Sequence, residues 1–226
     1  MDASVRSFSK SQDPLAAEEC CTTIGLGFAS EPNNAFFCAD AALFEGRWRA
    51  IAHNSLLRSP ETPLLHSVSH GDLQHAAVAF AYSYPEQKTP DDAPEPPGVI
   101  DLSGTGRPEA VPTRDEMLKF LGDKKNEFYA RRGPFEYVAF LATRPQLWGR
   151  GLGSRLLKYL TDRADAAGRW TYLEATSPDN ARLYARHGFR EIETKVWTLD
   201  CLPGERMMLI LMERPPAQQQ QQQQQP

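Results

Sequence analysis

The chain has 226 residues, of which 41% are hydrophobic, and a formal net charge of −4 at pH 7. This length can bury one sizeable core, and the acidic balance argues against nucleic acid or an anionic membrane as the main partner. No apolar run reaches the length of a membrane-spanning helix, and the N-terminus MDASVRSFSK lacks the hydrophobic core of a signal peptide. The four cysteines show no C-x-x-C spacing, which favours a reduced, cytoplasmic protein.

The N-terminal part predicts a short strand followed by two helices. Residues 4–9 alternate weakly between polar and apolar side chains, as a short edge strand does. Asp13 and Pro14 are typical of an N-cap and a first helical position, so a helix is predicted from Pro14 to about Phe28. A second helix is predicted over 41–57, because its apolar residues share one side: Leu43, Phe44, Trp48, Ile51 and Ala52.

Two strands are predicted next, over 64–69 and 75–84, joined by a hairpin turn around Gly71. Three histidines in this region, His66, His70 and His75, raise the question of a metal site. They straddle the turn and have no cysteine among them. We therefore interpret them as surface and turn histidines and expect no metal.

Residues 85–112 differ in composition, with seven prolines, several acids and no apolar periodicity. We expect a flexible loop inserted within one domain rather than a domain boundary, because the fold is incomplete on either side of it. A helix is predicted to follow from Thr113 to Arg131, with Thr113 and Glu116 as a capping box at its start.

The stretch YVAFLATRPQLWGRGLGSR, residues 137–155, predicts an anion site. Its first six residues form a continuous apolar run, typical of a buried strand. Gly149, Gly151 and Gly153 follow at alternating positions, and leucines then recur at helical spacing. Glycines let backbone N–H groups approach a phosphate, and the N–H groups of a first helical turn point at it. The stretch therefore predicts a phosphorylated cofactor.

The spacing of these glycines does not fit the two common nucleotide-binding loops. A dinucleotide fingerprint requires a third glycine where Ser154 or Leu156 stands. A nucleoside-triphosphate loop requires a Lys-Ser or Lys-Thr pair after the glycines, and none follows. Another kind of phosphorylated cofactor is therefore favoured.

The C-terminal third predicts a parallel strand–helix–strand unit and an antiparallel pair. Gly168 ends the helix, and residues 170–175 form a second buried strand. Ser177 and Pro178 start a short helix that ends at Gly188. Two strands then follow, over 191–199 and 206–212. The terminal glutamine tract is of low complexity, so we predict a single domain over 1–214 and a disordered tail over 215–226.

Two motifs together resemble a known family. The pattern P-x-x-x-G-R-G-L-G-S after an apolar strand resembles the acyl-CoA pyrophosphate loop of the GNAT superfamily of N-acetyltransferases. The stretch LEATSPDNARLYARHGF, residues 173–189, resembles the second hallmark of that family, and most closely that of the puromycin-type branch. The resemblance implies an α/β fold: a mixed, mostly antiparallel central sheet with a parallel βαβ core, flanked by helices. It also implies that the first two helices wall the acceptor pocket.

The resemblance also implies a set of site residues, with acetyl-CoA as co-substrate and the thioester between two splayed strands. Leu141 and Thr143 would contact the pantetheine arm, and Asn180 a cofactor amide. Tyr184 would be the acid facing the sulfur, because a phenol can protonate a leaving thiolate. Glu136 and Glu174 are the two candidate bases. The pyrophosphate would be bound by the loop residues Gly149, Arg150, Gly151, Leu152, Gly153 and Ser154.

One position departs from the family pattern. Trp148 stands where the family usually has a glutamine or an arginine, although backbone groups do most of the phosphate binding.

The function implied is the transfer of an acetyl group from acetyl-CoA to a primary amine, in a ternary complex, with a small molecule as the preferred acceptor. Two alternatives remain open: a non-catalytic acyl-CoA sensor, and an acetyltransferase of protein amines. The sequence is compatible with a monomer or a homodimer. It does not distinguish acetyl from longer acyl groups.

Overall fold

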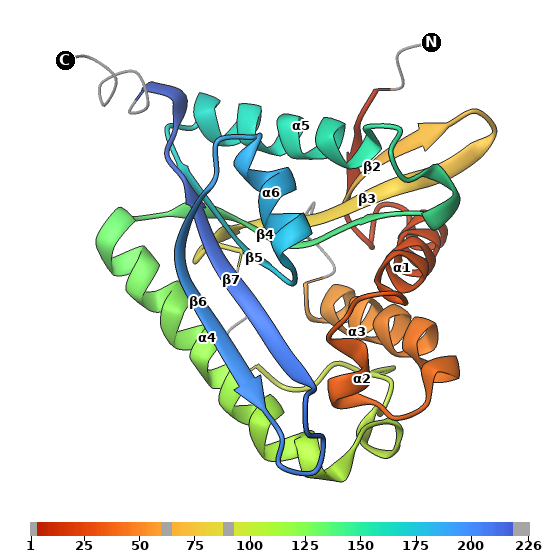
Figure 1. Ribbon diagram of the computed structural model, residues 1–226. Coiled ribbons are helices and arrows are strands. Elements are labelled where there is room, and N and C mark those ends of the chain that lie inside the picture. Colours follow the sequence, from red (N-terminus) through yellow and green to blue (C-terminus); the bar gives the residue numbers. More distant parts are fainter. Residues whose placement is uncertain (1–3, 60–64, 88–92, 219–226) are drawn as a thin grey trace.

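A computed structural model describes residues 4–59, 65–87 and 93–218. Its centre is one seven-stranded sheet in the order β1-β2-β3-β4-β5-β7-β6 (Figure 1). Only the β4–β5 pair is parallel, and the other five pairs are antiparallel. The predicted mixed, mostly antiparallel sheet with a parallel core is confirmed. The strands are β1 (Arg6–Phe8), β2 (Leu65–His70), β3 (Leu73–Tyr84), β4 (Phe135–Thr143), β5 (Trp170–Ala175), β6 (Arg190–Thr198) and β7 (Arg206–Arg214).

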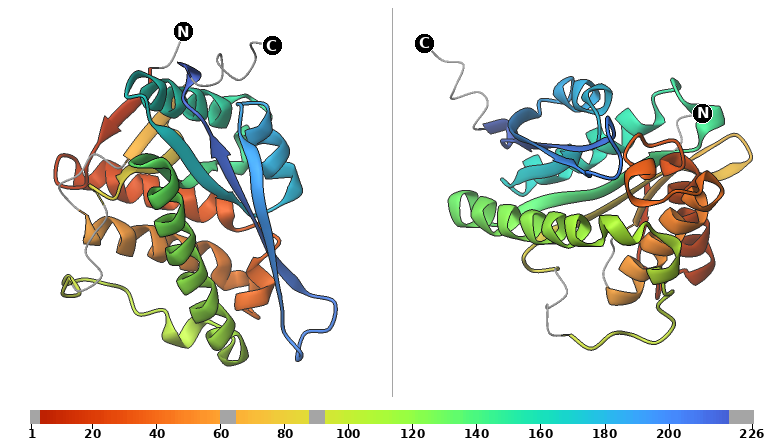
Figure 2. Two further views of the ribbon diagram at one scale, coloured as in Figure 1. Left: turned by 90° about the vertical axis from the view of Figure 1, so that its left-hand side faces the viewer. Right: turned by 60° about the horizontal axis from the view of Figure 1, so that its bottom comes forward.

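The helices cover both faces of this sheet. Two helices pack on one face, against buried side chains of β3, β4 and β5. The other helices pack on the opposite face (Figure 2). The first group is α5 (Leu152–Ala166) and α6 (Pro178–Ala185). The second group is α1 (Pro14–Phe28), α3 (Phe44–Arg58) and α4 (Val111–Arg132), with the single turn α2 (Asn34–Phe37) beside them. None of the helices in the described ranges is long and apolar enough to cross a membrane.

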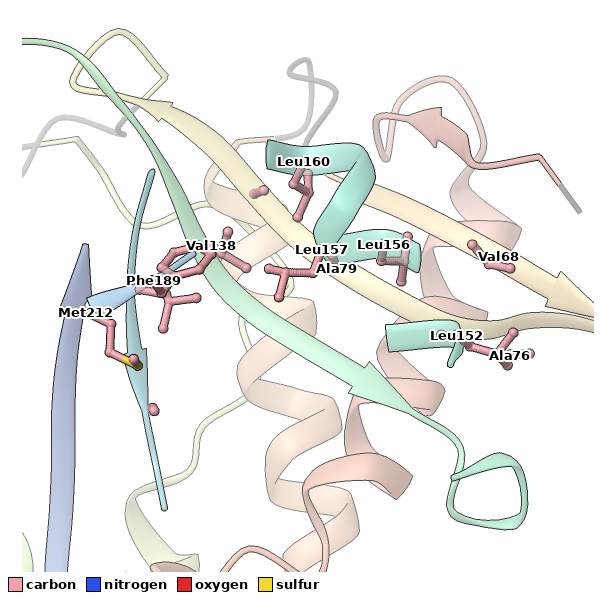
Figure 3. Packing of buried hydrophobic residues seen from close by; sticks show 14 of the residues in the cluster. Val68, Ala76, Ala79, Val138, Leu152, Leu156, Leu157, Leu160, Phe189 and Met212 are labelled. Atoms are coloured by element: carbon pink, nitrogen blue, oxygen red, sulfur yellow. The ribbon is translucent and has the colours of Figure 1, made fainter. Parts of the chain in front are cut away.

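The core beneath α5 follows from the leucine spacing of the sequence. Leu156 and Leu157 are fully buried, and with Leu152 and Leu160 they pack onto the small residues of β2 and β3 (Figure 3). Full burial of one such leucine stabilises the fold by about 1.5–3 kcal/mol. This packing fixes the position of the N-terminus of α5 relative to the sheet.

The opposite face is formed by the predicted N-terminal helices, whose start and end are largely confirmed. Asp13 Oδ1 accepts a hydrogen bond from the Ala16 backbone N–H at 3.0 Å, as an N-cap does. The two helices α1 and α3 lie close together at Gly25, where a Cβ would come within 2.8 Å of the Glu45 carbonyl oxygen. This close approach requires a residue without a side chain at position 25 and packs α1 directly against α3.

The two central strands separate, as the resemblance implied. The β4–β5 ladder ends at the pair Val138–Leu173, although both strands continue. Beyond that point β5 pairs only with β7, while β4 bulges at Ala139 against β3. One edge of β4 from Ala139 to Thr143 is therefore open toward a gap in the sheet.

The interpretation of the histidines is wrong for two of them. His66 and His75 are buried, because they lie beneath α5 and against Ser67 respectively. Arg163 donates to His66 Nε2 at 3.1 Å, and burial lowers the pKa of His66 to about 3, so the ring is neutral. Within the described ranges, no group of three His, Cys, Asp or Glu side chains could hold a metal ion.

The predicted capping box is also wrong. The helix α4 begins before Thr113, at Val111, and its N-cap residue Ala110 makes no side-chain hydrogen bond. Pro112 fits the first turn without a backbone N–H, so the helix extends over it. Glu116 instead accepts a hydrogen bond from Trp197 Nε1 at 3.0 Å, which joins α4 to β6.

The proline-rich insert and the tail fall partly outside the described residues, in 88–92 and 219–226. The described part of the insert is attached to α3. Asn54 Nδ2 donates to the Ile100 carbonyl at 3.0 Å, and its Oδ1 accepts from the Ile100 N–H at 2.9 Å. After β7 the packed chain continues past 214, because Ala217 N–H donates to Asp165 Oδ1 at 2.8 Å.

Candidate active site

A cleft of about 1440 Å³ opens where β4 and β5 separate. One end is lined by the glycine loop before α5 and by α6. The other end is lined by the α1–α2 connection, α3 and α4. The cleft therefore passes through the gap in the sheet and connects its two faces.

The glycine loop presents unpaired backbone donors to the cleft. Gly149 and Gly151 have φ angles of +77° and +76°, which side-chain-bearing residues adopt only with strain. Gly151 is the N-cap of α5, so the N–H groups that follow have no helical partner. In the described part of the chain, no hydrogen bond is found for the N–H groups of Gly149, Gly151, Leu152, Gly153 and Ser154, all of which line the cleft.

Arg150 is placed differently from the rest of the loop. Its N–H donates to the Leu147 carbonyl at 3.4 Å, and the residue does not line the cleft. The N-terminus of the 15-residue helix α5 adds a partial positive charge, and its first turn contains no acid. The loop can thus bind a phosphate group through its main chain, as expected for a diphosphate-bearing cofactor.

Trp148 has a defined role in the structure. Its indole Nε1 donates to the Thr143 carbonyl at 2.8 Å, while the ring is 53% exposed and lines the cleft. One lone pair of the Thr143 carbonyl is therefore taken by the indole. Leu141 lines the cleft on the open edge of β4, where its backbone is not paired with β5.

Asn180 belongs to a polar network at the end of β5. Its Nδ2 donates to Thr176 Oγ1 at 3.0 Å, and the Thr176 hydroxyl donates to Glu31 Oε2 at 2.5 Å. Ser177 caps α6 and accepts from the Asn180 N–H at 3.2 Å. Asn33 also reaches this point, because its Nδ2 donates to the Met208 carbonyl of β7 at 3.1 Å. The connection from α1 to α2 is thereby attached to the end of β5 and to β7.

Sequence reasoning missed Glu31, Asn33 and Thr176. The run Glu31-Pro32-Asn33-Asn34 after an apolar helix is an unusual concentration of polar side chains. Only the fold shows that this run meets the end of β5, which lies more than a hundred residues further along the chain.

Tyr184 lies on α6 and lines the cleft beside the cluster under α5. Its ring is half-buried and lies 6.0 Å from the Phe189 ring. Among the described residues no group hydrogen-bonds its hydroxyl, which leaves that hydroxyl for a ligand. Burial, and then the negative charge of Glu31, raise the pKa of Tyr184 above its ordinary value. The phenol is therefore protonated at neutral pH and available as a donor.

Glu174 lies on β5 and faces α4 rather than α5. Tyr137 donates its hydroxyl to Glu174 Oε2 at 2.8 Å, while Oε1 is buried without a hydrogen-bond partner among the described residues. Burial raises the pKa of Glu174, and the charge of Lys125 and the bond from Tyr137 oppose this rise. A carboxylate with a raised pKa and a vacant lone pair can accept a proton from an incoming amine.

Glu136, the other candidate base, does not lie in the cleft. It accepts a hydrogen bond from the Ser83 hydroxyl at 2.6 Å and lies 3.6 Å from an Arg169 nitrogen, at the start of β4. Side chains alternate along a strand, so Glu136 projects with Val138 toward α5, away from Tyr137. The structure therefore brings only Glu174 of the two glutamates to the site.

Aromatic rings form the far wall of the cleft, beside the open edge of β4. The rings of Phe28 and Trp48 are 4.7 Å apart, and that of Phe140 is 5.8 Å from Phe28. Trp48 Nε1 donates to Asn34 Oδ1 at 2.6 Å, which holds the indole against α2. This wall can accommodate an apolar body of a second substrate.

The sequence of residues 115–191 matches the family model described as an acetyltransferase (GNAT) domain. No curated protein matches the chain. Polyamine N-acetyltransferase from Drosophila melanogaster has 16% sequence identity and a TM-score of 0.59, over 95% of this chain and 100% of that chain. A Corynebacterium glutamicum protein described as histone acetyltransferase HPA2 and related acetyltransferase has 19% identity and a TM-score of 0.58, over 96% and 98%. Arylalkylamine N-acetyltransferase 2 from Aedes aegypti has 13% identity and a TM-score of 0.54, over 95% and 99%. At these identities the likeness establishes the fold.

Proposed function

We propose that this chain, whose residues 115–191 match the model of an acetyltransferase (GNAT) domain, transfers the acetyl group of acetyl-CoA to the primary amine of a small molecule, in a ternary complex. The single observation that carries this proposal is the placement of Tyr184 and Glu174. Tyr184 packs against the core beneath α5 and lines the cleft, and Glu174 lines the cleft on the α4 side of the sheet, where Tyr137 binds it. An acid and a base thus face one gap from opposite sides of the sheet.

The residues present fit the cofactor. The unpaired N–H groups of the loop would hold the pyrophosphate, with Gly151 in a conformation that favours glycine: Gly149, Gly151, Leu152, Gly153 and Ser154. The open edge of β4 at Leu141 would hold the pantetheine arm. Acetyl-CoA supplies the activated thioester.

The remaining steps belong to side chains of the chain. Glu174 Oε1 takes a proton from the amine as its nitrogen attacks the thioester carbon, and Tyr184 gives its proton to the departing sulfur. The carbon–nitrogen bond forms as the carbon–sulfur bond breaks. The proton taken by Glu174 then passes to Tyr184 through solvent, which restores both side chains. Acid and base contributions of this kind amount to about 10²–10⁴-fold in rate each.

The proposed setting is cytoplasmic. Cys20, Cys21, Cys38 and Cys201 are all unpaired in the structure, as in reducing compartments. Burial raises the pKa of Cys20 and of Cys21, to about 12 in the latter, so neither is a reactive thiol.

Acetyl transfer can be measured with radiolabelled acetyl-CoA and a panel of primary amines. Product counting is preferable to a thiol reagent, because Cys201 is exposed and would react with the reagent. We expect amine-dependent transfer by the wild-type protein. Tight CoA binding without transfer to any small amine or peptide would instead establish a binding protein, and transfer to peptides alone would establish a protein acetyltransferase.

A further inference from the structure

The charges that line the acceptor side of the cleft differ from those at the α6 end, where Asp179 and Arg186 bring both signs. The acids come from the connection after α1, from β5 and from α6, all beside the gap: Glu31, Glu174 and Asp179. The cations on the acceptor side come from α3 and α4: Arg47, Arg58, Arg114 and Lys125. Neither α3 nor α4 contributes an acid to the lining.

Lys125 is the cation of this set nearest to the proposed base. Its Nζ lies 4.8 Å from the centre of the Tyr137 ring, and the Tyr137 hydroxyl binds Glu174. Other lysines of α4 are paired with acids outside the cleft: Lys119 with Asp123 at 2.5 Å, and Lys124 with Glu193 at 2.9 Å. Lys125 has no carboxylate within 4.0 Å in the described part of the chain, and its side chain is half-buried.

Arg47 is the corresponding cation of the α3 wall. It donates to the Thr105 hydroxyl, a neutral partner, and no described carboxylate pairs with it. Arg58 and Arg114 differ, because they pair with Glu95 and Asp115. Two half-buried cations that line the cleft, Arg47 and Lys125, therefore have no carboxylate within 4.0 Å among the described residues.

Resting on the proposed function, we propose that the acceptor amine also carries a carboxylate or a phosphate, with an apolar body between the two groups. The amine approaches Glu174, the body contacts the rings of Phe28 and Trp48, and the anion is attracted by Lys125 and Arg47. Complementary potential both favours such a substrate and disfavours a diamine, which brings a second positive charge to a cationic wall. The substrate class is thus an acidic amine rather than a polyamine.

The test compares two acceptors of nearly equal shape, 4-(2-aminoethyl)benzoate and 4-(2-aminoethyl)benzamide, with agmatine as a dication. We expect kcat/KM for the carboxylate to exceed that for the amide by about tenfold, as one partly buried ion pair provides. Lys125→Gln should reduce this ratio toward one, and Arg47→Gln should reduce it in part. Lys124→Gln is the matched control and should leave the ratio unchanged.

The ratio cancels any effect of Lys125 on the base, because both acceptors use Glu174. A ratio of one in the wild-type protein, or a preference for agmatine, overturns the inference while leaving acetyl transfer intact. If no amine is acetylated, the proposed function fails, and calorimetry of the two acceptors with the CoA-bound protein decides the inference: equal affinities overturn it, and tighter binding of the carboxylate supports it.

Discussion

The two ends of the cleft are built in different ways. The proposed cofactor end is formed by two short continuous segments, residues 141–154 and 176–184. The first contains the end of β4 and the start of α5, and the second follows β5 directly and contains the start of α6. The proposed acceptor end is formed by α3, by α4, by Leu102 of the proline-rich insert and by the connection after α1. The first end depends on local backbone geometry, and the second on contacts between distant segments, such as Asn54 with Ile100.

This difference separates what each end can tolerate. A backbone site loses function when one glycine changes, whereas a wall of side chains can be altered piece by piece. The same difference explains why the cofactor end resembles a family and the acceptor end does not indicate its substrate by pattern alone. Five predictions, taken from the largest expected effect to the smallest, test this contrast.

Gly151→Val should abolish CoA binding and so define the cofactor end. A valine at φ +76° is strained by about 1–3 kcal/mol and would displace the N–H groups proposed to bind the pyrophosphate. We expect the dissociation constant for CoA, measured by calorimetry, to rise by about two orders of magnitude or more.

Gly168→Val is the matched control for this change. Gly168 has a φ of +64° at the other end of the same helix, outside the cleft, and a Cβ there meets no other atom within 4 Å. We expect Gly168→Val to lose about as much thermal stability as Gly151→Val but to bind CoA with the affinity of the wild-type protein. Equal loss of affinity in both variants would show that strain in α5, rather than the loop, controls binding.

Glu174→Gln should lower kcat by about 10²–10³-fold, because the amide cannot accept the amine proton. Affinity for CoA should remain within about threefold, since Glu174 lies on the acceptor face. Glu136→Gln is the matched control, because it makes the same carboxylate-to-amide change on the other face of the sheet. Its kcat should stay within about threefold of wild type. A large loss of rate in Glu136→Gln alone would reverse the assignment of the base.

The pH dependence of kcat at saturating amine sharpens the same assignment. Because burial raises the pKa of Glu174, the proton-accepting form is lost as the pH falls through a value above the ordinary glutamate pKa. The positive charge of Lys125 opposes the rise, so Lys125→Gln should move the acidic limb of the profile to higher pH. A limb that stays in place in this variant would mean that another group titrates.

Tyr184→Phe should lower kcat by about 10–100-fold with little change in CoA affinity. The ring remains packed against Phe189, and only the hydroxyl without a protein partner is removed. Thiol esters with a more acidic leaving group need less protonation, so the loss should shrink with an activated acetyl thioester. An equal loss for both donors would indicate a structural role for the hydroxyl.

Asn54→Ala should have the smallest effect and should be confined to the acceptor end. The variant removes both hydrogen bonds to Ile100 and leaves those backbone groups to find water, at a cost of about 1–3 kcal/mol in stability. We expect KM for the amine to rise severalfold while CoA affinity stays unchanged. A rise in the CoA dissociation constant would show that the two ends are coupled through α3.

The contrast also explains how far the sequence could be interpreted. The leucine spacing of α5, the three glycines and Ser177-Pro178 are local signals, so the strand, loop and helix starts are confirmed where expected. The capping box at Thr113 was wrong because Ala110 to Pro112 can extend the helix, which a four-residue pattern does not reveal. The prediction that His66 lies at the surface was wrong, because its burial under α5 depends on tertiary packing that the local sequence does not reveal.

Charge at the acceptor wall is not predictable from a pattern either. Lys124 and Lys125 are neighbours in sequence, yet one pairs with an acid of β6 and the other faces the cleft. The rotation of α4 about its axis relative to the sheet decides which of the two lysines faces the cleft. This rotation cannot be predicted from the sequence of α4 alone, because its apolar residues do not gather on one side.

The strand order carries a consequence for synthesis on the ribosome. β7 lies between β5 and β6, although it follows both in the chain. Until residues 206–214 have left the ribosome, the edge of β5 that faces away from β4 is unpaired. The position of β5 on its side of the gap is then not fixed by β7. Glu213, which accepts hydrogen bonds from Arg132 and Arg190, is also in this last segment. A nascent chain can therefore contain every residue of the glycine loop and still lack β7, the strand that holds β5 in place. We expect ligand binding to begin only after β7 emerges.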